Sequence, residues 1–244
     1  MNRTIIIIPS RMAASRLKGK PLLEINKIPI ICHVLNRAKE TGLESIVASE
    51  DKEIIAAVEK NGGQAILTEK HRTGTDRIFE AFKKLKKKNV DHILNLQGDE
   101  PMIDPMDVVN LNKLMIKHNS DIGTLASEIE ERKVLNNENI VKVITKEKLE
   151  NNNFVRALNF SRKTLYNKKY NIYHHIGIYC YKISILERFV HLDQTKNEIK
   201  NNLEQLRAMD NGIQINVSLA KSSSIGVDTK EDYMALKKIM EYKS

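Results

Sequence analysis

Four cations lie close together near the start of the chain, and they are Arg11, Arg16, Lys18 and Lys20. They belong to the segment PSRMAASRLKGKP, residues 9–21, which directly follows the apolar run Ile5 to Ile8. An apolar run that ends in Pro and small residues predicts a buried parallel strand that leads into a loop. In parallel α/β sheets, ligands bind beyond the carboxyl ends of the strands. The cations therefore favour a phosphate-rich ligand, and we expect a nucleotide, although such a loop could also carry cations that are only solvated.

The same loop lacks the two familiar phosphate-binding motifs. No Ser or Thr follows Lys20, so the P-loop pattern is absent, and no Gly-x-Gly-x-x-Gly fingerprint is present. Ser10, Ala13 and Gly19 are small enough to let backbone N–H groups approach a ligand. The phosphate prediction thus depends on the cations and on the position of the loop.

Two further groups contain carboxylates. Asp99, in QGDEP at residues 97–101, follows a predicted strand, where Mg²⁺ would find an oxygen ligand beside substrate phosphates. Asp99 could equally be an ordinary turn residue. Asp228, in GVDTKE at residues 226–231, stands three residues before Glu231 and resembles an N-cap box for the last helix.

The elements that position these groups alternate along the first half of the chain. Apolar runs predict strands at residues 5–8, 45–48, 64–67, 92–96, 122–126 and 140–144. Helical periodicity predicts helices from Pro29 to Gly42, up to Gly62, through the lysine-rich segment before residue 89, and from Pro105 to His118. This alternation predicts an α/β fold with a doubly wound, mostly parallel sheet.

The pattern changes in the second half. Residues 145–171 are rich in Asn and Lys, with one strand-like stretch at 154–160, so we expect an excursion over about 145–182 within a single domain, 1–244. After it come a strand from His174, helices ending near His191 and Met209, a strand at 213–217 and a last helix.

Composition narrows the class of protein. The 244 residues are 41% hydrophobic, enough for a sizeable core. The formal charge of +9 suggests nucleic acid or an anionic membrane as a partner, but much of the excess is one lysine block at residues 83–88, typical of a solvated helix end. A nucleic-acid-binding module is the alternative class, and it is disfavoured because no nucleic-acid motif accompanies the charge.

Two further features concern the compartment. Cys32 and Cys180 show no metal-ligand spacing, so we expect free thiols in a reducing cytosol. The start MNRTIIIIPSR has too few apolar residues for a signal peptide, and no run approaches the ~20 residues of a membrane span. We therefore expect a soluble, cytoplasmic protein with no membrane partner.

Taken together, the motifs closely resemble the 3-deoxy-manno-octulosonate cytidylyltransferases (CMP-Kdo synthetases). The matching segments are Arg11, RL at 16–17, GKPL at 19–22, HRTGTDR at 71–77, NLQGDEP at 95–101, FSR at 160–162, HIGIY at 175–179, LEQLR at 203–207 and GVDT at 226–229. The match is colinear over nearly the whole chain. RLxGKPL also occurs in related sugar nucleotidyltransferases, whereas QGDEP, HIGIY and LEQLR together are much more specific.

The resemblance implies a Rossmann-like nucleotidyltransferase fold and a cytoplasmic, Mg²⁺-dependent homodimer that makes CMP-Kdo and pyrophosphate from CTP and Kdo for lipopolysaccharide synthesis. The excursion would contribute to the dimer interface and the sugar site. Arg11 and Lys20 would hold the triphosphate, with Arg16 in support, while Asp99 and Asp228 would bind Mg²⁺. The remaining nucleotide contacts would come from Pro9, Ser10, Arg72, Thr73 and Gly74. Nucleic acid is not an expected partner.

The family's sugar-side positions fall on Gln97, Arg162, His175, Tyr179, Glu204 and Gln205. A sugar acid needs a cation for its carboxylate and several hydrogen-bonding side chains. His175 and Tyr179 share one face of a strand and could simply be packed there. Glu204 and Arg207 could be only a surface pair on a helix.

The chain departs from the family pattern mainly on the sugar side. Lys18 and Lys230 stand where the family usually has Pro, KTLY replaces Ala-x-Ile-Pro at residues 163–166, and TKNEIKNN precedes LEQLR at residues 195–202. These changes leave the use of CTP and Mg²⁺ nearly untouched but leave open a related sugar acid such as 8-amino-Kdo.

Overall fold

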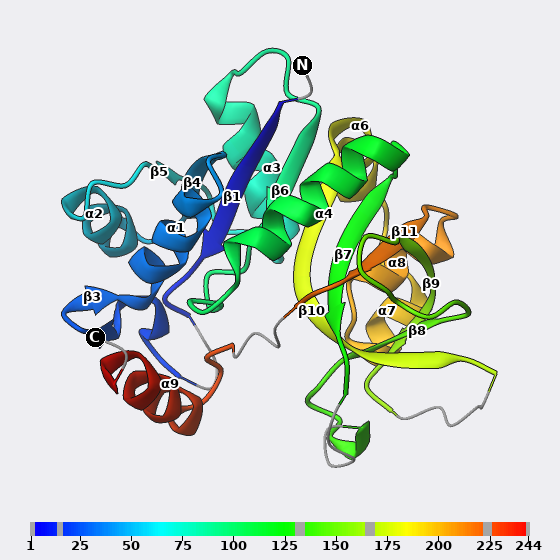
Figure 1. Cartoon of the computed structure of the whole chain (residues 1–244). Coiled ribbons are helices and arrows are strands. Elements are labelled where there is room, and N and C mark those ends of the chain that lie inside the picture. Colours follow the sequence, from blue (N-terminus) through cyan, green and yellow to red (C-terminus); the bar gives the residue numbers. More distant parts are fainter. Residues whose placement is uncertain (1–2, 14–16, 130–134, 164–168, 222–225, 243–244) are drawn as a thin grey trace. The chain divides into compact units, whose positions relative to one another are not determined.

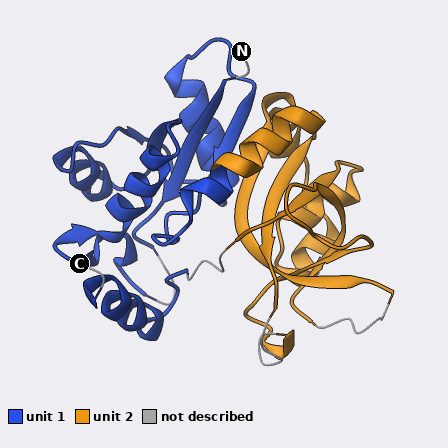
Figure 2. Ribbon diagram, in the orientation of Figure 1, with its two compact units in different colours: residues 1–108, 224–244 blue, residues 109–223 orange. Residues whose placement is uncertain are grey.

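The computed structural model describes residues 3–13, 17–129, 135–163, 169–221 and 226–242. The chain forms two compact units, residues 1–108 with 224–244 (unit 1) and residues 109–223 (unit 2), shown in separate colours in Figure 2. The segment expected as an excursion, about 145–182, is part of unit 2, which begins well before it. The reason is that its strands pair with strands on both sides of it in sequence.

Unit 1 is built on four parallel strands in the order β5-β4-β1-β6, as Figure 1 shows. They are β1 (Thr4–Ser10), β4 (Glu44–Ser49), β5 (Ala65–Leu67) and β6 (His92–Asn95). Strand β1 is buried along its whole length because β4 and β6 flank it, with Ile5 opposite Glu44 on one side and Ile93 on the other. Parallel pairing brings the carboxyl ends of these strands to the same edge of the sheet.

The helices of unit 1 are α1 (Ile30–Glu40), α2 (Lys52–Lys60), α3 (Gly74–Leu85) and α9 (Lys230–Tyr242), and the 3-10 turn η1 covers Lys20–Leu22. Helix α1 packs on β4, and α3 packs on β1 and β4. Helix α9 packs instead on a hairpin of β2 (Glu24–Ile25) and β3 (Ile28–Pro29), which the sequence analysis did not predict. Asn26 and Lys27 turn this hairpin with φ angles of 51° and 63°, as a tight two-residue turn requires.

Unit 2 contains a ring of five strands. They are β7 (Ile122–Ser127), β8 (Lys142–Thr145), β9 (Val155–Ser161), β10 (Asn171–Lys182) and β11 (Ile215–Leu219). They pair in the order β10-β7-β11-β9-β8, and β8 pairs back to β10. The β7–β11 pair is parallel and the other pairs are antiparallel. Within unit 2 the long strand β10 pairs with both β7 and β8, and its register with β7 shifts between Ile176 and Tyr179.

Helix α4 (Pro105–His118) leads into unit 2, and α6 (Ile183–Val190), α7 (Lys196–Asn201) and α8 (Gln205–Asp210) lie between β10 and β11 in sequence. The sequence predicts α4 with these bounds, but it predicts two helices where the structure places α6, α7 and α8. Asn202 adopts a φ of 51° and ends α7 before α8 begins.

Strand β8 begins two residues later than predicted. The amide of Ile140 donates to the carbonyl of Asn137 at 3.1 Å, so residues 137–140 form a turn ahead of the strand.

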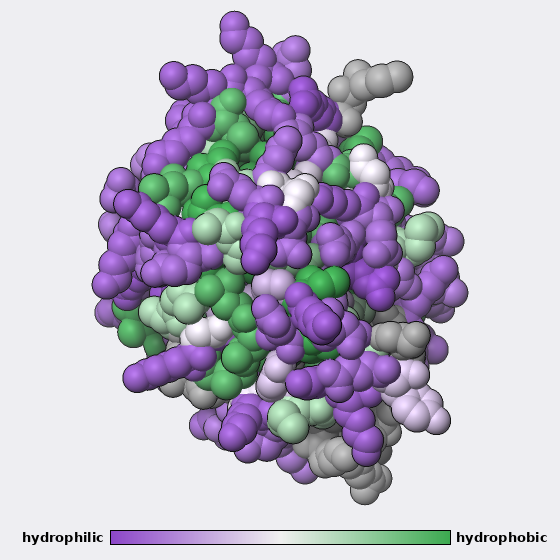
Figure 3. Space-filling view, turned by 90° about the vertical axis from the view of Figure 1, so that its left-hand side faces the viewer, coloured by the Kyte–Doolittle hydropathy of each residue, from purple (hydrophilic) through white to green (hydrophobic). Residues whose placement is uncertain are grey.

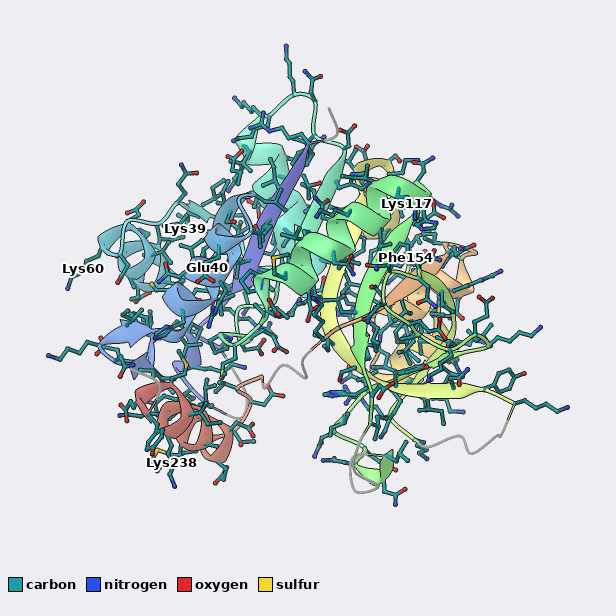
Figure 4. The ribbon with its side chains drawn as sticks, in the orientation of Figure 1. Lys39, Glu40, Lys60, Lys117, Phe154 and Lys238 are labelled. Atoms are coloured by element: carbon teal, nitrogen blue, oxygen red, sulfur yellow. The ribbon has the colours of Figure 1, made fainter. Side chains whose placement is uncertain are left out.

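Several exposed lysines lie on helices of unit 1. Lys60 on α2 and Lys238 on α9 extend outward from their helices in Figure 4, and the face in Figure 3 is mostly hydrophilic with hydrophobic patches between. In the lysine block, Lys83, Lys84, Lys86 and Lys88 are exposed, as expected of a solvated helix end, while Lys84 pairs with Glu80 and Lys87 pairs with Glu44. Cys32 and Cys180 are free, as predicted, and both are buried. In the described part of the chain, no helix has the length and apolar character needed to cross a membrane.

Candidate functional site

The first loop is anchored to the start of α2. The amide of Met12 donates to Asp51 Oδ2 at 2.7 Å, and Asp51 stands at the N-terminus of α2. Gly19 has a φ of 69°, a conformation that favours glycine, and it leads directly into η1. The loop therefore places Lys20 in a short, fixed turn, while Arg16 lies outside the described residues.

Lys20 joins the two carboxylates predicted for the metal. Its Nζ atom lies 2.8 Å from Asp99 Oδ2 and 3.3 Å from Asp228 Oδ1, and it donates to the carbonyl of Val227 at 2.6 Å. The Lys20 side chain is only 12% exposed. One cation thus engages both carboxylates at once, from segments that are far apart in sequence.

Close backbone packing brings the QGDEP segment to the first loop. A Cβ atom on Gly98 would lie 2.9 Å from the carbonyl oxygen of Pro9, so a larger residue there would displace the loop. The amide of Val227 donates to the carbonyl of Asp99 at 2.9 Å and ties the GVDT segment to the same place.

The cap of α9 differs from the prediction by one residue. Thr229 Oγ1 accepts from the amide of Asp232, and Asp232 Oδ2 accepts from the amide of Thr229. The capping pair is therefore Thr229 with Asp232, and the predicted pair of Asp228 with Glu231 is wrong. Because Thr229 caps the helix, the Asp228 carboxylate is left to face Lys20.

The HRTGTDR segment forms the N-terminus of α3. Thr73 caps the helix by accepting from the amide of Asp76 at 3.1 Å, and a Cβ atom on Gly74 would lie 3.2 Å from a ring carbon of Pro9. A helix N-terminus presents backbone N–H groups that favour anions. Arg77 is buried against Glu50 and Thr68, at 2.8 Å and 3.0 Å, and fixes the helix to the end of β4.

These segments surround a cavity of about 450 Å³, a volume in the range of small-molecule sites. Ten of the predicted site residues line it, namely Pro9, Ser10, Arg11, Lys20, Arg72, Thr73, Gly74, Gln97, Asp99 and Asp228. Gln97, predicted on the sugar side, shares this cavity with the nucleotide positions. All of these residues belong to unit 1.

Several residues of this cavity were not predicted from the sequence as site residues. His71 and Arg77 line it and stand in the HRTGTDR motif. His71 contacts Glu80 through its ring, and Arg77 pairs with Glu50. Glu50 and Asp51 directly follow a predicted parallel strand, and this position could have identified them as residues that support the site.

In unit 2 the predicted sugar-side residues His175, Tyr179 and Glu204 come together. The rings of His175 and Tyr179 lie 5.4 Å apart, and the His175 ring meets Phe160 edge-on at 5.0 Å. Burial, followed by the charge of His174, lowers the pKa of His175 to about 3. Burial, followed by Tyr181 and Glu204, raises the pKa of Tyr179, so both side chains are neutral near pH 7.

Thr124 sets the tautomer of His175. The Thr124 hydroxyl donates to the carbonyl of Ile178 at 2.6 Å, and its Oγ1 atom lies 3.0 Å from His175 Nε2. Because a hydroxyl carries one hydrogen, Nε2 must supply the proton of the second bond. His175 Nδ1 then has a lone pair that can accept a hydrogen bond from a hydroxyl group.

The LEQLR helix is held by a buried ion pair. Arg207 donates to both carboxylate oxygens of Glu198, at 2.8 Å and 2.6 Å, and lies 4.9 Å from the centre of the Phe189 ring. The expected pair of Glu204 with Arg207 is present at 3.7 Å, but it is not a surface pair, because Arg207 is only 4% exposed. Glu198 also forms a capping box with Thr195, so the divergent TKNEIKNN segment fixes α7 to α8.

Gln205 and Arg162 complete the predicted set. Gln205 is the first residue of α8. Arg162 follows β9, and its Nη1 atom donates to the carbonyls of Glu138 and Asn139 at 3.3 Å and 3.2 Å. Residues 164–166 of the divergent KTLY segment lie outside the described residues.

Comparison with known proteins gives a consistent result. The family model described as Cytidylyltransferase matches residues 5–215. The 3-deoxy-manno-octulosonate cytidylyltransferase of Afipia carboxidovorans is 42% identical over 97% of this chain and 96% of its own length. That of Thermodesulfovibrio yellowstonii is 41% identical over 97% of this chain and 98% of its own length.

Two solved structures were also compared. A CMP:2-keto-3-deoxy-manno-octonic acid synthetase complexed with CTP is 34% identical, covers 100% of both chains and superposes with a TM-score of 0.89. A UDP-glucose pyrophosphorylase complexed with UDP-glucose, only 14% identical, superposes with a TM-score of 0.72 and shares the fold. The mixed α/β architecture with a nucleotidyltransferase sheet, as predicted from the sequence, is confirmed.

Proposed function

Since the chain belongs to the 3-deoxy-manno-octulosonate cytidylyltransferase family and transfers CMP from CTP to Kdo, we propose that the cavity of unit 1 binds CTP together with Mg²⁺. The observation that carries this proposal is the placement of Lys20 between Asp99 and Asp228. The positive Arg11, Lys20 and Arg72 side chains and the N-terminus of α3 suit a triphosphate.

The donor set at this cavity fits Mg²⁺. Asp99 and Asp228 offer carboxylate oxygens to one cation, which in this structure is the ammonium group of Lys20. No cluster of three acidic, His or Cys side chains suited to a metal occurs in the described ranges. Mg²⁺ is commonly bound through one or two carboxylates together with substrate phosphates. When bound, Mg²⁺ would neutralise charge that builds on the α-phosphate and assist the attacking hydroxyl.

The chain's own residues do the rest by positioning and charge. The anomeric hydroxyl of Kdo attacks the α-phosphate as the bond to pyrophosphate breaks. Lys20 can exchange the carboxylates for phosphate oxygens when CTP enters, and Arg11 adds a second cation on the leaving side. Thr73 and Gly74 present the backbone at the start of α3 to the nucleotide.

The sugar acid is assigned to the residues of unit 2. Neutral His175 accepts a hydrogen bond at Nδ1 from a hydroxyl group of the sugar. Neutral Tyr179 has a phenol group that can donate or accept a hydrogen bond. Glu204 and Gln205 supply further polar atoms, and Arg162 pairs with the carboxylate of the sugar. We also place the enzyme in the cytoplasm as a homodimer that supplies CMP-Kdo for lipopolysaccharide.

The test measures pyrophosphate release from CTP with Kdo, with 8-amino-Kdo, and with other nucleotides, each with and without Mg²⁺. We expect turnover with CTP, Kdo and Mg²⁺, and its loss on chelation with EDTA. Faster turnover with 8-amino-Kdo would favour the related sugar acid, and turnover that survives metal removal would contradict the role of Mg²⁺. Light scattering of the purified protein tests the dimer.

Substitution of the carboxylates tests the site itself. Asp99→Asn and Asp228→Asn should each lower kcat by at least ~10²-fold, the usual scale for losing one charge contact in the transition state. Glu231→Gln is the matched control, because Glu231 is an exposed carboxylate three residues after Asp228. Binding of Mn²⁺, followed by its paramagnetic resonance, should weaken in the two Asp variants and remain in the control. Rates in Asp99→Asn or Asp228→Asn that match the control would remove that residue from the mechanism.

A further inference from the structure

A buried lysine in unit 2 has no place in the mechanism so far. Lys142, the first residue of β8, is 1% exposed. An ammonium group is costly to remove from water unless it is hydrogen-bonded. Its Nζ atom donates to the carbonyls of Asn137 and Arg162, at 2.6 Å and 2.7 Å. Within the described ranges, no carboxylate lies within ion-pair distance of it.

Arg162 returns contacts to the same loop. Its Nη1 atom donates to the carbonyls of Glu138 and Asn139. Lys142 therefore holds the backbone of Arg162, while the Arg162 side chain holds the backbone beside Asn137. The Nε and Nη2 atoms of Arg162 make no hydrogen bond with the rest of the described chain. Together they form the edge of a guanidinium that pairs best with a carboxylate, through two parallel bonds.

Strand pairing fixes where Lys142 stands. Its Cα atom is opposite Ser161 on β9, next to Arg162 in sequence, and opposite His174 on β10. Lys142 is thus paired with the residue before Arg162 on one side and with the residue before His175 on the other. A change at Lys142 would reach both candidate sugar contacts through the backbone.

The charges around Lys142 are mainly basic. Burial lowers the pKa of Lys142, Arg162 adds to the lowering, and Glu138 opposes it. Burial and then the charge of Lys142 lower the pKa of His174. Since His174 is neutral near pH 7, the charges here are Lys142 and Arg162 against Glu138, and this excess of one positive charge favours an anion.

We propose that Lys142 is a positioning residue, which fixes Arg162 so that the Nε and Nη2 edge of its guanidinium receives the carboxylate of the sugar acid. This rests on the assignment of Arg162 to the sugar acid in the proposed function. The alternative is a buried lysine that serves only the stability of unit 2.

The experiment compares kcat and the two KM values in the full-length enzyme. Lys142→Met keeps the length of the side chain and removes its charge, and Lys142→Gln keeps one donor if the Met variant does not fold. We expect either variant to raise KM for Kdo about tenfold or more, with KM for CTP within about twofold. Lys146→Met, at an exposed lysine just after β8, should leave both KM values unchanged.

A double variant separates positioning from stability. If Lys142 acts through Arg162, Lys142→Met with Arg162→Ala should raise KM for Kdo no further than Arg162→Ala does alone. Additive effects, or an equal rise of both KM values, would overturn the proposal. So would an unchanged KM for Kdo in the Lys142 variants when Arg162→Ala raises it. If Arg162→Ala itself leaves KM for Kdo unchanged, the sugar assignment of Arg162 is wrong, and the inference falls with it.

Discussion

Replacement of the buried His175 by Gln should change how stability depends on pH. In the folded chain the pKa of His175 is about 3, whereas the ordinary value is 6.5. The unfolded chain therefore binds a proton at His175 that the folded chain rejects, between about pH 6.5 and pH 3. Stability is highest above pH 6.5 and is lost as the pH falls, because protonation favours the unfolded state.

The size of this effect follows from the two pKa values. Between pH 7 and pH 5, one histidine that titrates only in the unfolded state costs about 2 kcal/mol of unfolding free energy. Gln has no titrating group, but its amide can still donate to Thr124. The wild-type protein should therefore lose about 2 kcal/mol more than His175→Gln over this range.

Urea unfolding followed by circular dichroism at pH 7, 6 and 5 measures the difference. The m values of the two proteins must agree at each pH, so that the comparison reflects proton binding and not a change in exposed surface. Curves of stability against pH that run parallel for wild type and variant would refute the reasoning, because His175 would then titrate alike in both states.

Two further substitutions test the supports of the site. Glu198→Gln should lower the unfolding free energy by about 3 kcal/mol in urea, because it removes the carboxylate that makes two hydrogen bonds to buried Arg207 and leaves only Glu204, at 3.7 Å; a loss below about 1 kcal/mol would show that the pair is dispensable. Gly98→Ala should raise KM for CTP about tenfold or more, because the added Cβ would lie 2.9 Å from the Pro9 carbonyl and displace the first loop. Gly212→Ala is the control, because a Cβ atom there would meet nothing within 4 Å. It introduces only the strain of an alanine at a φ of 72° and should leave KM for CTP unchanged.

Much of unit 1 could be predicted from sequence because its signals are local. The run Ile5 to Ile8 is buried on both faces, and a continuous apolar run is what such a strand requires. The helix over 105–118, which begins in unit 1 and continues into unit 2, has Pro at its start and was predicted with its observed bounds. The hairpin of β2 and β3 was missed because each strand has only two residues, too few for any periodicity.

Unit 2 was harder because its order depends on pairing between distant segments. The ring closes when β8 pairs with β10, and the sequence of neither strand indicates which strand it pairs with. Lys142 reads from sequence as one more surface lysine, yet it is buried because two carbonyls, at residues 137 and 162, converge on it. Glu198 likewise sits in a polar segment that resembles a loop, and only Arg207, nine residues later, explains its burial.

The position of the cap of α9 determines which carboxylates face Lys20. Asp228 and Asp232 both stand near the start of the helix, and either carboxylate could bond to the free backbone amides there. The structure assigns the cap to Thr229 and Asp232, and this leaves Asp228 with Lys20. Had Asp228 capped the helix, its oxygens would be engaged by amides, and Asp99 alone would face the cation. The spacing of Thr229 and Asp232 is therefore what leaves both Asp99 and Asp228 facing the Lys20 ammonium group at the edge of the unit 1 cavity.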